Sequence, residues 1–225
     1  MRTISTLALG AVLMGAASQA MSKNTTYNIG VVSDYVYRGI SQTDNGVALQ
    51  GGADYKVGNA YAGAWFSNVE EQDDSEGIPV EMDVYFGYNH KFGGFNLDTS
   101  IKTYNYLNDT NGDLTEFRLA TNPIKGLEIG INREVKSKFW YPEVNYERFL
   151  PHRLYLDLHA GYWNIDDADD NALDFRAELA RDFPELHHID FFIAASHITD
   201  STPGGDDADE DDAETLFLFG VRKNF

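Results

Sequence analysis

The chain has 225 residues, and its 17 Lys and Arg against 36 Asp and Glu give a formal net charge of −19. This acidity argues against nucleic acid as a partner, because the phosphates would be repelled. The chain contains no Cys, which excludes a disulfide framework. Its 13% aromatic residues and 20 Gly are typical of strands joined by tight turns.

Residues 1–20 have the features of a secretory signal peptide. Arg2 is the basic start, Ile4–Ala17 is apolar and rich in small residues, and Ser18–Ala20 offers small residues at the cleavage site. The apolar run is too short for a convincing membrane-spanning helix. We therefore expect an exported chain whose mature part, residues 21–225, forms one domain with a net charge near −20.

From Thr25 onward, apolar and polar residues alternate with period two, which predicts β-strands with two different faces. In the clearest segment, Val80, Met82 and Val84 alternate with Glu81 and Asp83. Twelve strands are predicted, in chain order at Tyr27–Arg38, Val47–Lys56, Tyr61–Val69, Val80–Asn89, Phe95–Lys102, Glu116–Leu119, Leu127–Asn132, Trp140–Tyr146, Leu154–Tyr162, Leu173–Leu179, Ile189–His197 and Leu216–Phe225.

The connections between these strands alternate as well. Those after odd strands are long and mostly acidic, at 38–46, 70–77, 105–113, 164–171 and 200–214, with the one near Lys136 as the exception in charge. Those after even strands are shorter or more basic, near Gly58 and at 91–94, 122–126, 148–153 and 182–188. An up-and-down barrel with its N-terminus in the periplasm has this asymmetry, whereas a Greek-key sandwich gives no reason for it. The predicted fold class is all-β, an antiparallel up-and-down transmembrane β-barrel of about 12 strands.

The final segment is predicted to close the barrel. One of its faces carries Phe217, Phe219, Val221 and Phe225, and the chain stops on that last aromatic residue. This pattern resembles the assembly signal of Gram-negative outer-membrane proteins. Aromatic residues near strand ends fit the interfacial girdles of such a barrel, namely Tyr35, Tyr37, Tyr55, Tyr88, Trp140 and Tyr162.

Two stretches carry a specific resemblance: "SDYVYRGISQTDNGVALQGGADY" (Ser33–Tyr55) and "YAGAWFSNV" (Tyr61–Val69). Together they resemble the bacterial TorF-family porins, also called the Gcw_chp family. The resemblance is strongest over residues 27–69 and extends through "FGYNHKFGGF" and "KTYNYLND". It implies an exported outer-membrane β-protein. It implies no established substrate and no catalytic residue.

Charged residues recur in mid-strand, opposite the apolar face. Asp34 and Arg38 lie four residues apart in the first predicted strand and should share a face. The residues predicted to line the interior are Asp34, Arg38, Gln50, Asp54, Glu81, Asp83, Lys102, Glu116, Arg118, Asp157, His159, Arg176 and Glu178. They could form a polar pathway for small solutes, or a network of ion pairs that fills a closed lumen. Strand number does not decide, because twelve lies between eight strands, whose lumen side chains can fill, and sixteen, which leave a channel.

Catalysis is not expected. The six His residues have no metal spacing, and no Gly-x-Ser-x-Gly motif occurs. The acidic segments 70–76, 166–170 and 200–214 lack the spacing of an EF-hand loop and at most bridge lipopolysaccharide through diffuse divalent cations. We expect no cofactor and no fixed metal site.

These patterns predict a porin in the outer membrane of a Gram-negative bacterium, with a mild preference for cations because most excess acid lies in the long connections. The expected partners are outer-membrane lipid and lipopolysaccharide, the barrel-assembly machinery and small polar solutes. Two alternatives stay open. One is a closed structural or interaction barrel that displays acidic loops, and the other is a soluble periplasmic β-sandwich with a binding face.

Overall fold

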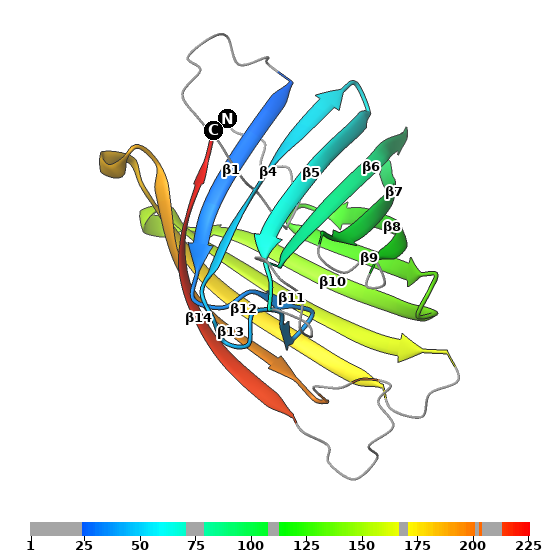
Figure 1. The fold of residues 1–225 in the computed structure, drawn as a ribbon. Coiled ribbons are helices and arrows are strands. Elements are labelled where there is room, and N and C mark those ends of the chain that lie inside the picture. The colour runs from blue at the N-terminus through cyan, green and yellow to red at the C-terminus, as the bar shows by residue number, and fades with distance from the viewer. Residues whose placement is uncertain (1–23, 71–78, 108–112, 167–170, 201–202, 204–212) are drawn as a thin grey trace.

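The structure is a computed structural model that describes residues 24–70, 79–107, 113–166, 171–200, 203 and 213–225. In this part of the chain, twelve antiparallel strands form a closed barrel in which β1 pairs with β14 (Figure 1). Its strands are β1 (Thr25–Val32), β4 (Ala48–Val57), β5 (Ala60–Asn68), β6 (Val80–Phe92), β7 (Phe95–Tyr106), β8 (Leu114–Ile124), β9 (Leu127–Glu134), β10 (Phe139–Leu150), β11 (Leu154–Ile165), β12 (Ala172–Phe183), β13 (Ile189–Ile198) and β14 (Glu214–Asn224). The predicted twelve-stranded barrel is thus confirmed, while the predicted signal peptide lies outside the described residues.

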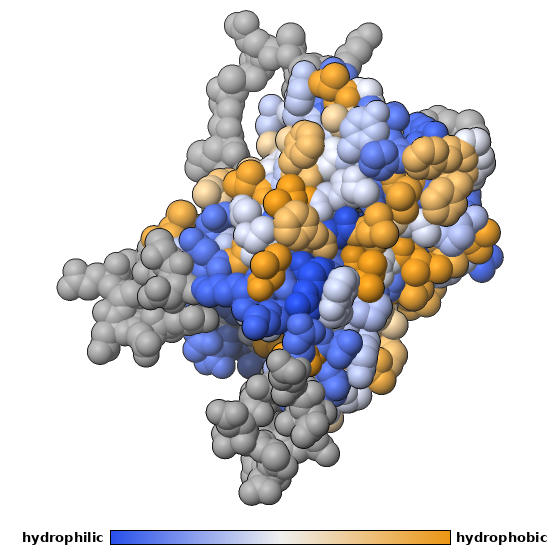
Figure 2. Space-filling model, turned by 90° about the vertical axis from the view of Figure 1, so that its right-hand side faces the viewer, coloured by the Kyte–Doolittle hydropathy of each residue, from blue (hydrophilic) through white to orange (hydrophobic). Residues whose placement is uncertain are grey.

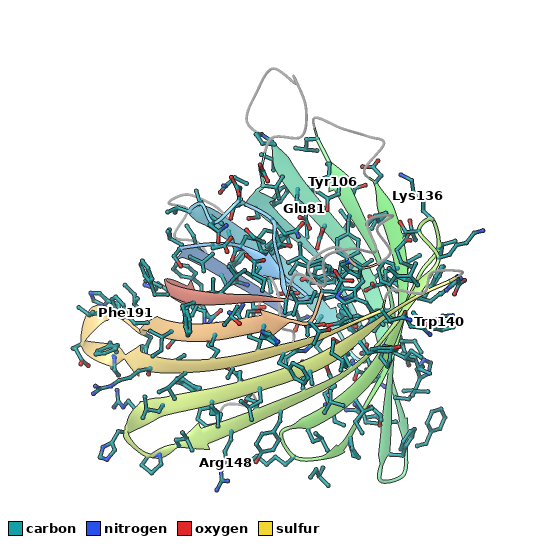
Figure 3. All side chains as sticks on the ribbon, turned by 90° about the horizontal axis from the view of Figure 1, so that it is seen from below. Glu81, Tyr106, Lys136, Trp140, Arg148 and Phe191 are labelled. Atoms are coloured by element: carbon teal, nitrogen blue, oxygen red, sulfur yellow. The ribbon has the colours of Figure 1, made fainter. Side chains whose placement is uncertain are left out.

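The alternating pattern places apolar side chains outside the wall and polar ones inside it. In β6, Val84 and Phe86 are 45% and 56% exposed, whereas Glu81 and Asp83 are each only 2% exposed. Trp140, Arg148 and Phe191 project from the outside of the wall in Figure 3. In Figure 2, hydrophobic side chains cover much of the upper and right-hand wall, and hydrophilic ones gather lower in the view. A soluble sandwich would bury the apolar face instead.

The two ends of the barrel differ, as the alternating connections predict. At one end lie tight turns such as Gly58–Asn59, the short 3-10 helices η2 (Pro151–Arg153) and η3 (Pro184–Leu186), and the last residue. There the Phe225 N–H donates to the Tyr27 carbonyl oxygen at 2.8 Å. We call this the turn end and the opposite one the loop end. No helix in the described ranges is long and apolar enough to cross a membrane.

The first strand is shorter than predicted. β1 ends at Val32, which pairs with Gly220 halfway along β14. Beyond that point the Ser33 N–H donates to the Phe219 carbonyl oxygen at 2.9 Å, and the chain leaves the wall. The prediction of one strand over Tyr27–Arg38 is therefore wrong, and Asp34 and Arg38 do not share a strand face.

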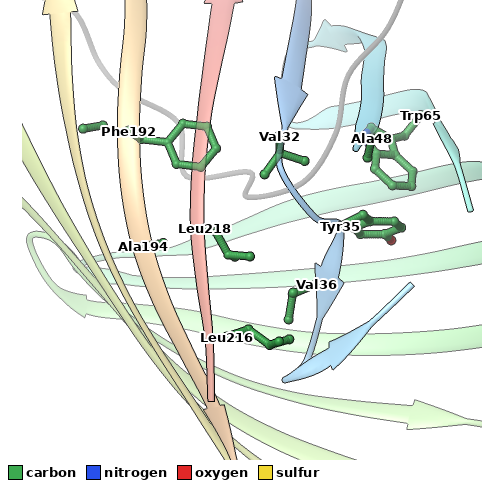
Figure 4. Close-up of a cluster of buried hydrophobic side chains, with 10 residues drawn as sticks. Val32, Tyr35, Val36, Ala48, Trp65, Phe192, Ala194, Leu216 and Leu218 are labelled. Carbon is green, nitrogen blue, oxygen red and sulfur yellow. The ribbon is translucent and has the colours of Figure 1, made fainter. Parts of the chain in front are cut away.

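Residues 33–47, which we call the inner loop, fold into the barrel (Figure 4). They contain a two-stranded sheet of β2 (Val36–Tyr37) and β3 (Ile40–Ser41), joined by Arg38 and Gly39. These two residues have φ angles of +49° and +89°, as a two-residue hairpin turn of the primed kind requires. The predicted strand thus breaks at the bend of Ser33 and Asp34, and the Arg38-Gly39 pair then reverses the chain inside the barrel.

The inner loop explains why parts of the wall are apolar on both faces. In β13, Phe191 and Ile193 are exposed outside, while Phe192 and Ala194 are buried inside. The inward pair belongs to a cluster with Val36 of the inner loop and Leu216 and Leu218 of β14 (Figure 4). Without the loop these apolar groups would face a water-filled lumen.

Two girdle assignments are also wrong. Tyr35 is only 3% exposed and packs edge-on against Trp65 inside the barrel, with ring centroids 5.0 Å apart. Tyr37 likewise lies inside, against Tyr104 of β7. Both belong to the inner loop rather than to a wall strand, so strand alternation could not place them.

The turn of the inner loop offers a direct test. A Cβ on Gly39 would lie 2.7 Å from the Ile198 Cβ, so Gly39→Ala should push the loop off the wall. Gly58 also has a positive φ of 61° but has no atom within 4 Å of such a Cβ, so Gly58→Ala carries similar backbone strain, about 1–2 kcal/mol, without the clash.

Tryptophan emission of the folded protein should shift to the red in Gly39→Ala, because Trp65 and Trp163 both contact the inner loop. The Gly58→Ala control should emit like the wild type. Equal spectra for all three proteins, each still heat-modifiable on gels, would contradict the packing described here.

Candidate functional site

The inner loop crosses the lumen and contacts wall strands on several sides. The Tyr35 hydroxyl donates to Glu81 Oε1 of β6 at 3.3 Å, and the Tyr37 and Tyr104 hydroxyls lie 2.6 Å apart. At the far side, Gly39 meets Ile198 of β13. Because these wall residues lie towards the ends of their strands nearest the long connections, the loop narrows the lumen in its loop-end half.

Arg38 is the main polar link between the loop and the wall. Its Nη1 lies 2.7 Å from Glu116 Oε2 of β8, and the two side chains are 8% and 5% exposed. The angles at this contact do not meet those of a hydrogen bond, so it is an ion pair without ideal alignment. The Trp163 ring N–H also donates to the Arg38 carbonyl oxygen at 3.1 Å.

Asp34 holds the inner loop together rather than lining a strand. Its Oδ1 accepts from the Ser41 hydroxyl at 2.7 Å and from the Thr43 hydroxyl at 2.9 Å. Thr43 in turn accepts from the Tyr35 N–H at 3.0 Å. These hydrogen bonds join the residues before and after the hairpin, so Asp34 stabilises the loop that has Arg38 at its tip.

A second group of predicted residues lies beside the loop. Glu81 and Asp83 are buried next to each other on β6, and Lys102 Nζ reaches Asp83 Oδ2 at 3.2 Å. Tyr104 lies on β7, between the two acids on β6 and Glu116 on β8, and its hydroxyl donates to Glu116 Oε1 at 3.2 Å. Lys102 therefore offsets part of the negative charge that burial concentrates here.

Towards the turn end, Arg118 bridges two strands. Its guanidinium contacts Glu128 at 2.6 Å and Glu143 at 3.0 Å. Asp54, which was also predicted, accepts a short hydrogen bond from the Tyr85 hydroxyl. Gln50 faces inward on the same strand as Asp54 and is partly exposed.

His159 belongs to a chain of hydrogen bonds with three other side chains. Its Nδ1 lies 2.6 Å from Asn145 Oδ1 and its Nε2 lies 3.0 Å from Asp174 Oδ1. The Tyr141 hydroxyl donates to Asp174 Oδ2 at 2.7 Å and lies 2.8 Å from His159 Nε2. This network fixes the Tyr141 ring, which faces Arg38.

The last predicted residues lie on β11 and β12. Glu178 contacts Arg176 at 2.7 Å and Arg222 of β14 at 2.6 Å. Asp157 is opposite Glu178 in the register of β11 and β12, so two carboxylates face each other there. Arg222 was not predicted to line the interior. It lies on the same face of the closing strand as Gly220 and Asn224, and this polar face could have indicated an inward position.

Sequence reasoning missed the aromatic residues around Arg38. Tyr141 and Trp163 are 0% and 8% exposed and face inward from β10 and β11. Alternation with the outward Trp140 and Tyr162 would have placed both inside, since neighbouring residues in a strand face opposite ways. Pro142 made β10 a weak strand prediction, yet it is accommodated opposite Ile131.

The acidic segments of the sequence lie mostly outside the described residues. Asp166 is described, and Arg133 grips both of its carboxylate oxygens at 3.0 and 2.6 Å. These hydrogen bonds keep the pKa of Asp166 below its usual range. In the described part of the chain, no group of three or more His, Asp or Glu residues could hold a metal ion.

Comparison with known proteins places the chain in a family. No curated protein matches it by sequence. Among solved structures it is similar to the KdgM porin, with a TM-score of 0.55 and 10% identity over 89% of this chain and 99% of that one. It is also similar to the Acinetobacter baumannii outer membrane protein Omp33, with a TM-score of 0.51 and 10% identity over 90% of this chain and 98% of that one.

At such low identity these likenesses establish the shared fold alone. The family match has a different basis, because it rests on sequence and covers residues 16–162, more than half of the chain. The predicted family resemblance is confirmed at this level: the chain belongs to Gcw_chp, a family of bacterial proteins of unknown function.

Proposed function

We propose that the protein is an outer-membrane porin that lets small polar solutes diffuse through its barrel. The observation that carries the proposal is the inward face of a closed twelve-stranded barrel, from which charged groups such as Arg118, Asp157 and Glu178 project. The exposed apolar outer wall, including Phe86 and Phe217, suits contact with lipid. In this scheme the inner loop is the constriction of the pathway.

The remaining parts of the proposal concern export and placement. The signal peptide directs export, the closing face with Phe217, Phe219, Val221 and Phe225 is read by the assembly machinery, and the turn end lies in the periplasm. The chain is then a TorF-type porin within its family. The acidic long connections face lipopolysaccharide and can attract divalent cations diffusely.

A mild preference for cations follows from the charges. Besides the acids predicted to line the interior, Glu128, Glu143 and Asp174 also take part in inward ion pairs, as does the base Arg222. Carboxylates along the pathway concentrate cations and repel anions. Ion pairs neutralise many of these acids, so the preference should be modest.

No enzymatic role is proposed. The His159 network resembles a catalytic arrangement in its hydrogen bonds, but it contains no Ser nucleophile and its Tyr141 is fully buried against Arg38. Its contacts suit a structural role, holding the Tyr141 ring beside the inner loop.

A closed structural barrel is the second candidate, and the inner loop itself favours it. The loop and the wall bury Tyr35, Trp65, Tyr104 and Tyr141 almost completely, which leaves little space beside them. In that case the barrel would serve to display its long connections. The two candidates differ in whether ions pass the protein at all.

Ion flow in planar bilayers distinguishes them. Refolded protein should conduct, and its reversal potential across a salt gradient should indicate cation preference that weakens as salt rises, because charge is screened over about 8 Å at physiological salt. Replacing the Asp and Glu residues of 205–214 by Asn and Gln keeps the length of the connection and should reduce this preference at low salt only.

Anion selectivity in the intact protein would contradict the proposed placement of the charges. If neither the intact protein nor the neutralised variant conducts ions, although heat-modifiable migration confirms that both are folded barrels, the closed barrel is favoured.

The closing strand gives a separate test. Phe225 is half exposed on the outside of the wall, so Phe225→Asp should leave the barrel interior untouched. If the residue is part of an assembly signal, the variant should fail to reach the outer membrane and be degraded in the periplasm, as cell fractionation would report. Asn224→Asp, which adds the same single negative charge at the neighbouring exposed position, is the matched control. Wild-type levels of the Phe225 variant in the outer membrane would refute the assembly role.

A further inference from the structure

The guanidinium of Arg38 lies in a box of aromatic rings. Its Cζ is 3.8 Å from the centroid of the Tyr141 ring, 5.7 Å from that of Phe139 and 5.7 Å from that of Trp163. Tyr37, next to it in the inner loop, adds a fourth ring at 4.8 Å. Glu116 completes the enclosure with its carboxylate. Ring faces and a carboxylate together suit a cation with a planar, delocalised charge.

The part of this box that belongs to the wall is held by its own contacts. The Phe139 and Trp163 centroids are 4.9 Å apart, and Trp163 meets Tyr141 edge-on at 5.4 Å. The Tyr141 hydroxyl is fixed by Asp174, and Glu116 is fixed by the Tyr104 hydroxyl. None of these contacts involves Arg38, so we expect the box to keep its shape when Arg38 leaves.

Arg38 is a tethered occupant and an imperfect one. It sits on a two-residue turn with positive φ, and its contact with Glu116 lacks hydrogen-bond alignment. A free guanidinium is under no such backbone restraint and can turn its planar fork towards the carboxylate. The tether gives Arg38 a high effective concentration, so a competing solute must offset that advantage.

We propose that Phe139, Tyr141, Trp163 and Glu116 form a binding site for small solutes with a guanidinium group, which Arg38 occupies when none is present. Such a solute takes the place of the Arg38 head group and loosens the inner loop. The binding itself does not depend on the proposed porin function. Only the consequence, that a guanidinium solute opens its own pathway, rests on it.

Binding is tested first in a protein whose box is empty. Methylguanidinium is titrated into folded Arg38→Ala in detergent by calorimetry, with methylurea as a probe of similar shape and no charge. Methylguanidinium should bind the variant about tenfold or more tightly than the wild type, and methylurea should not bind. Adding Glu116→Gln to Arg38→Ala should weaken methylguanidinium binding about tenfold, since a charged hydrogen-bond partner is lost.

Arg148→Ala is the matched control, because Arg148 lies on the outside of the wall (Figure 3). It removes an arginine without emptying the box and should bind methylguanidinium no better than the wild type. Folding of each variant is checked by heat-modifiable migration. No binding to folded Arg38→Ala, or equal binding of methylurea, would overturn the proposal.

The wild-type protein provides a second measurement that holds even if Arg38→Ala does not fold. Higher concentrations of methylguanidinium, below those that unfold the barrel, should shift tryptophan emission as Arg38 is displaced from Trp163. Methylurea at the same concentrations should have no effect, and an unchanged spectrum with both would count against displacement. Conductance of the same protein distinguishes the two proposals. If methylguanidinium binds but no current flows, only the porin function is rejected. If current flows but methylguanidinium does not bind, only the guanidinium site is rejected.

Discussion

Closure of the sheet is the constraint on which the rest of the structure depends. Every barrel strand has a paired neighbour on each side, and apart from the first half of β14, which extends beyond the end of β1, this pairing satisfies the backbone polar groups of the wall without water. The wall then has only two faces, and the period-two sequence makes the outer one apolar and the inner one polar. Twelve strands enclose a wider lumen than eight, whose interior wall side chains already fill, and in this barrel residues 33–47 occupy part of the added space.

The inner loop is how the chain uses that space. β1 stops beside the middle of β14, and the next fifteen residues fold inward instead of extending the wall. Inward apolar groups such as Trp65, Phe192 and Leu218 are covered by the loop, and Arg38 finds its carboxylate on the opposite wall. A buried charge is costly without a partner, so the ion pair with Glu116 fixes where the tip of the loop can rest.

Much of the wall could be predicted from the sequence, because alternation such as that of Val80–Asn89 reports directly which side chains share a face. The inner loop could not be predicted, since residues 27–38 alternate acceptably as one strand, whereas the chain bends away from the wall at Ser33 and Asp34 and reverses at Arg38-Gly39. The sequence predicts that Asp34 and Arg38 line the interior from one strand face, but both belong to the inner loop, and their partners Ser41 and Glu116 depend on where that loop folds. Tyr141 and Trp163 were missed as interior residues for a different reason. Aromatic residues in a barrel suggest the membrane interface, and the inner loop that these two rings contact was not predicted.

The most direct test of the account is to lock the inner loop. The chain has no Cys, and a Cβ at position 39 would lie 2.7 Å from the Ile198 Cβ, whereas the two Cβ atoms of a disulfide lie about 3.8 Å apart. Gly39→Cys with Ile198→Cys therefore reaches disulfide geometry once the tip of the loop moves about 1 Å away from the wall, and the disulfide then holds it there. Single-channel current of this variant is compared in oxidised and reduced states, with Gly39→Cys alone as the control for strain. The account predicts a smaller current when the disulfide is formed, restored by reduction, and no redox effect in the control. The same current in both states, with the disulfide shown to form, would contradict a solute pathway through the barrel that the inner loop restricts.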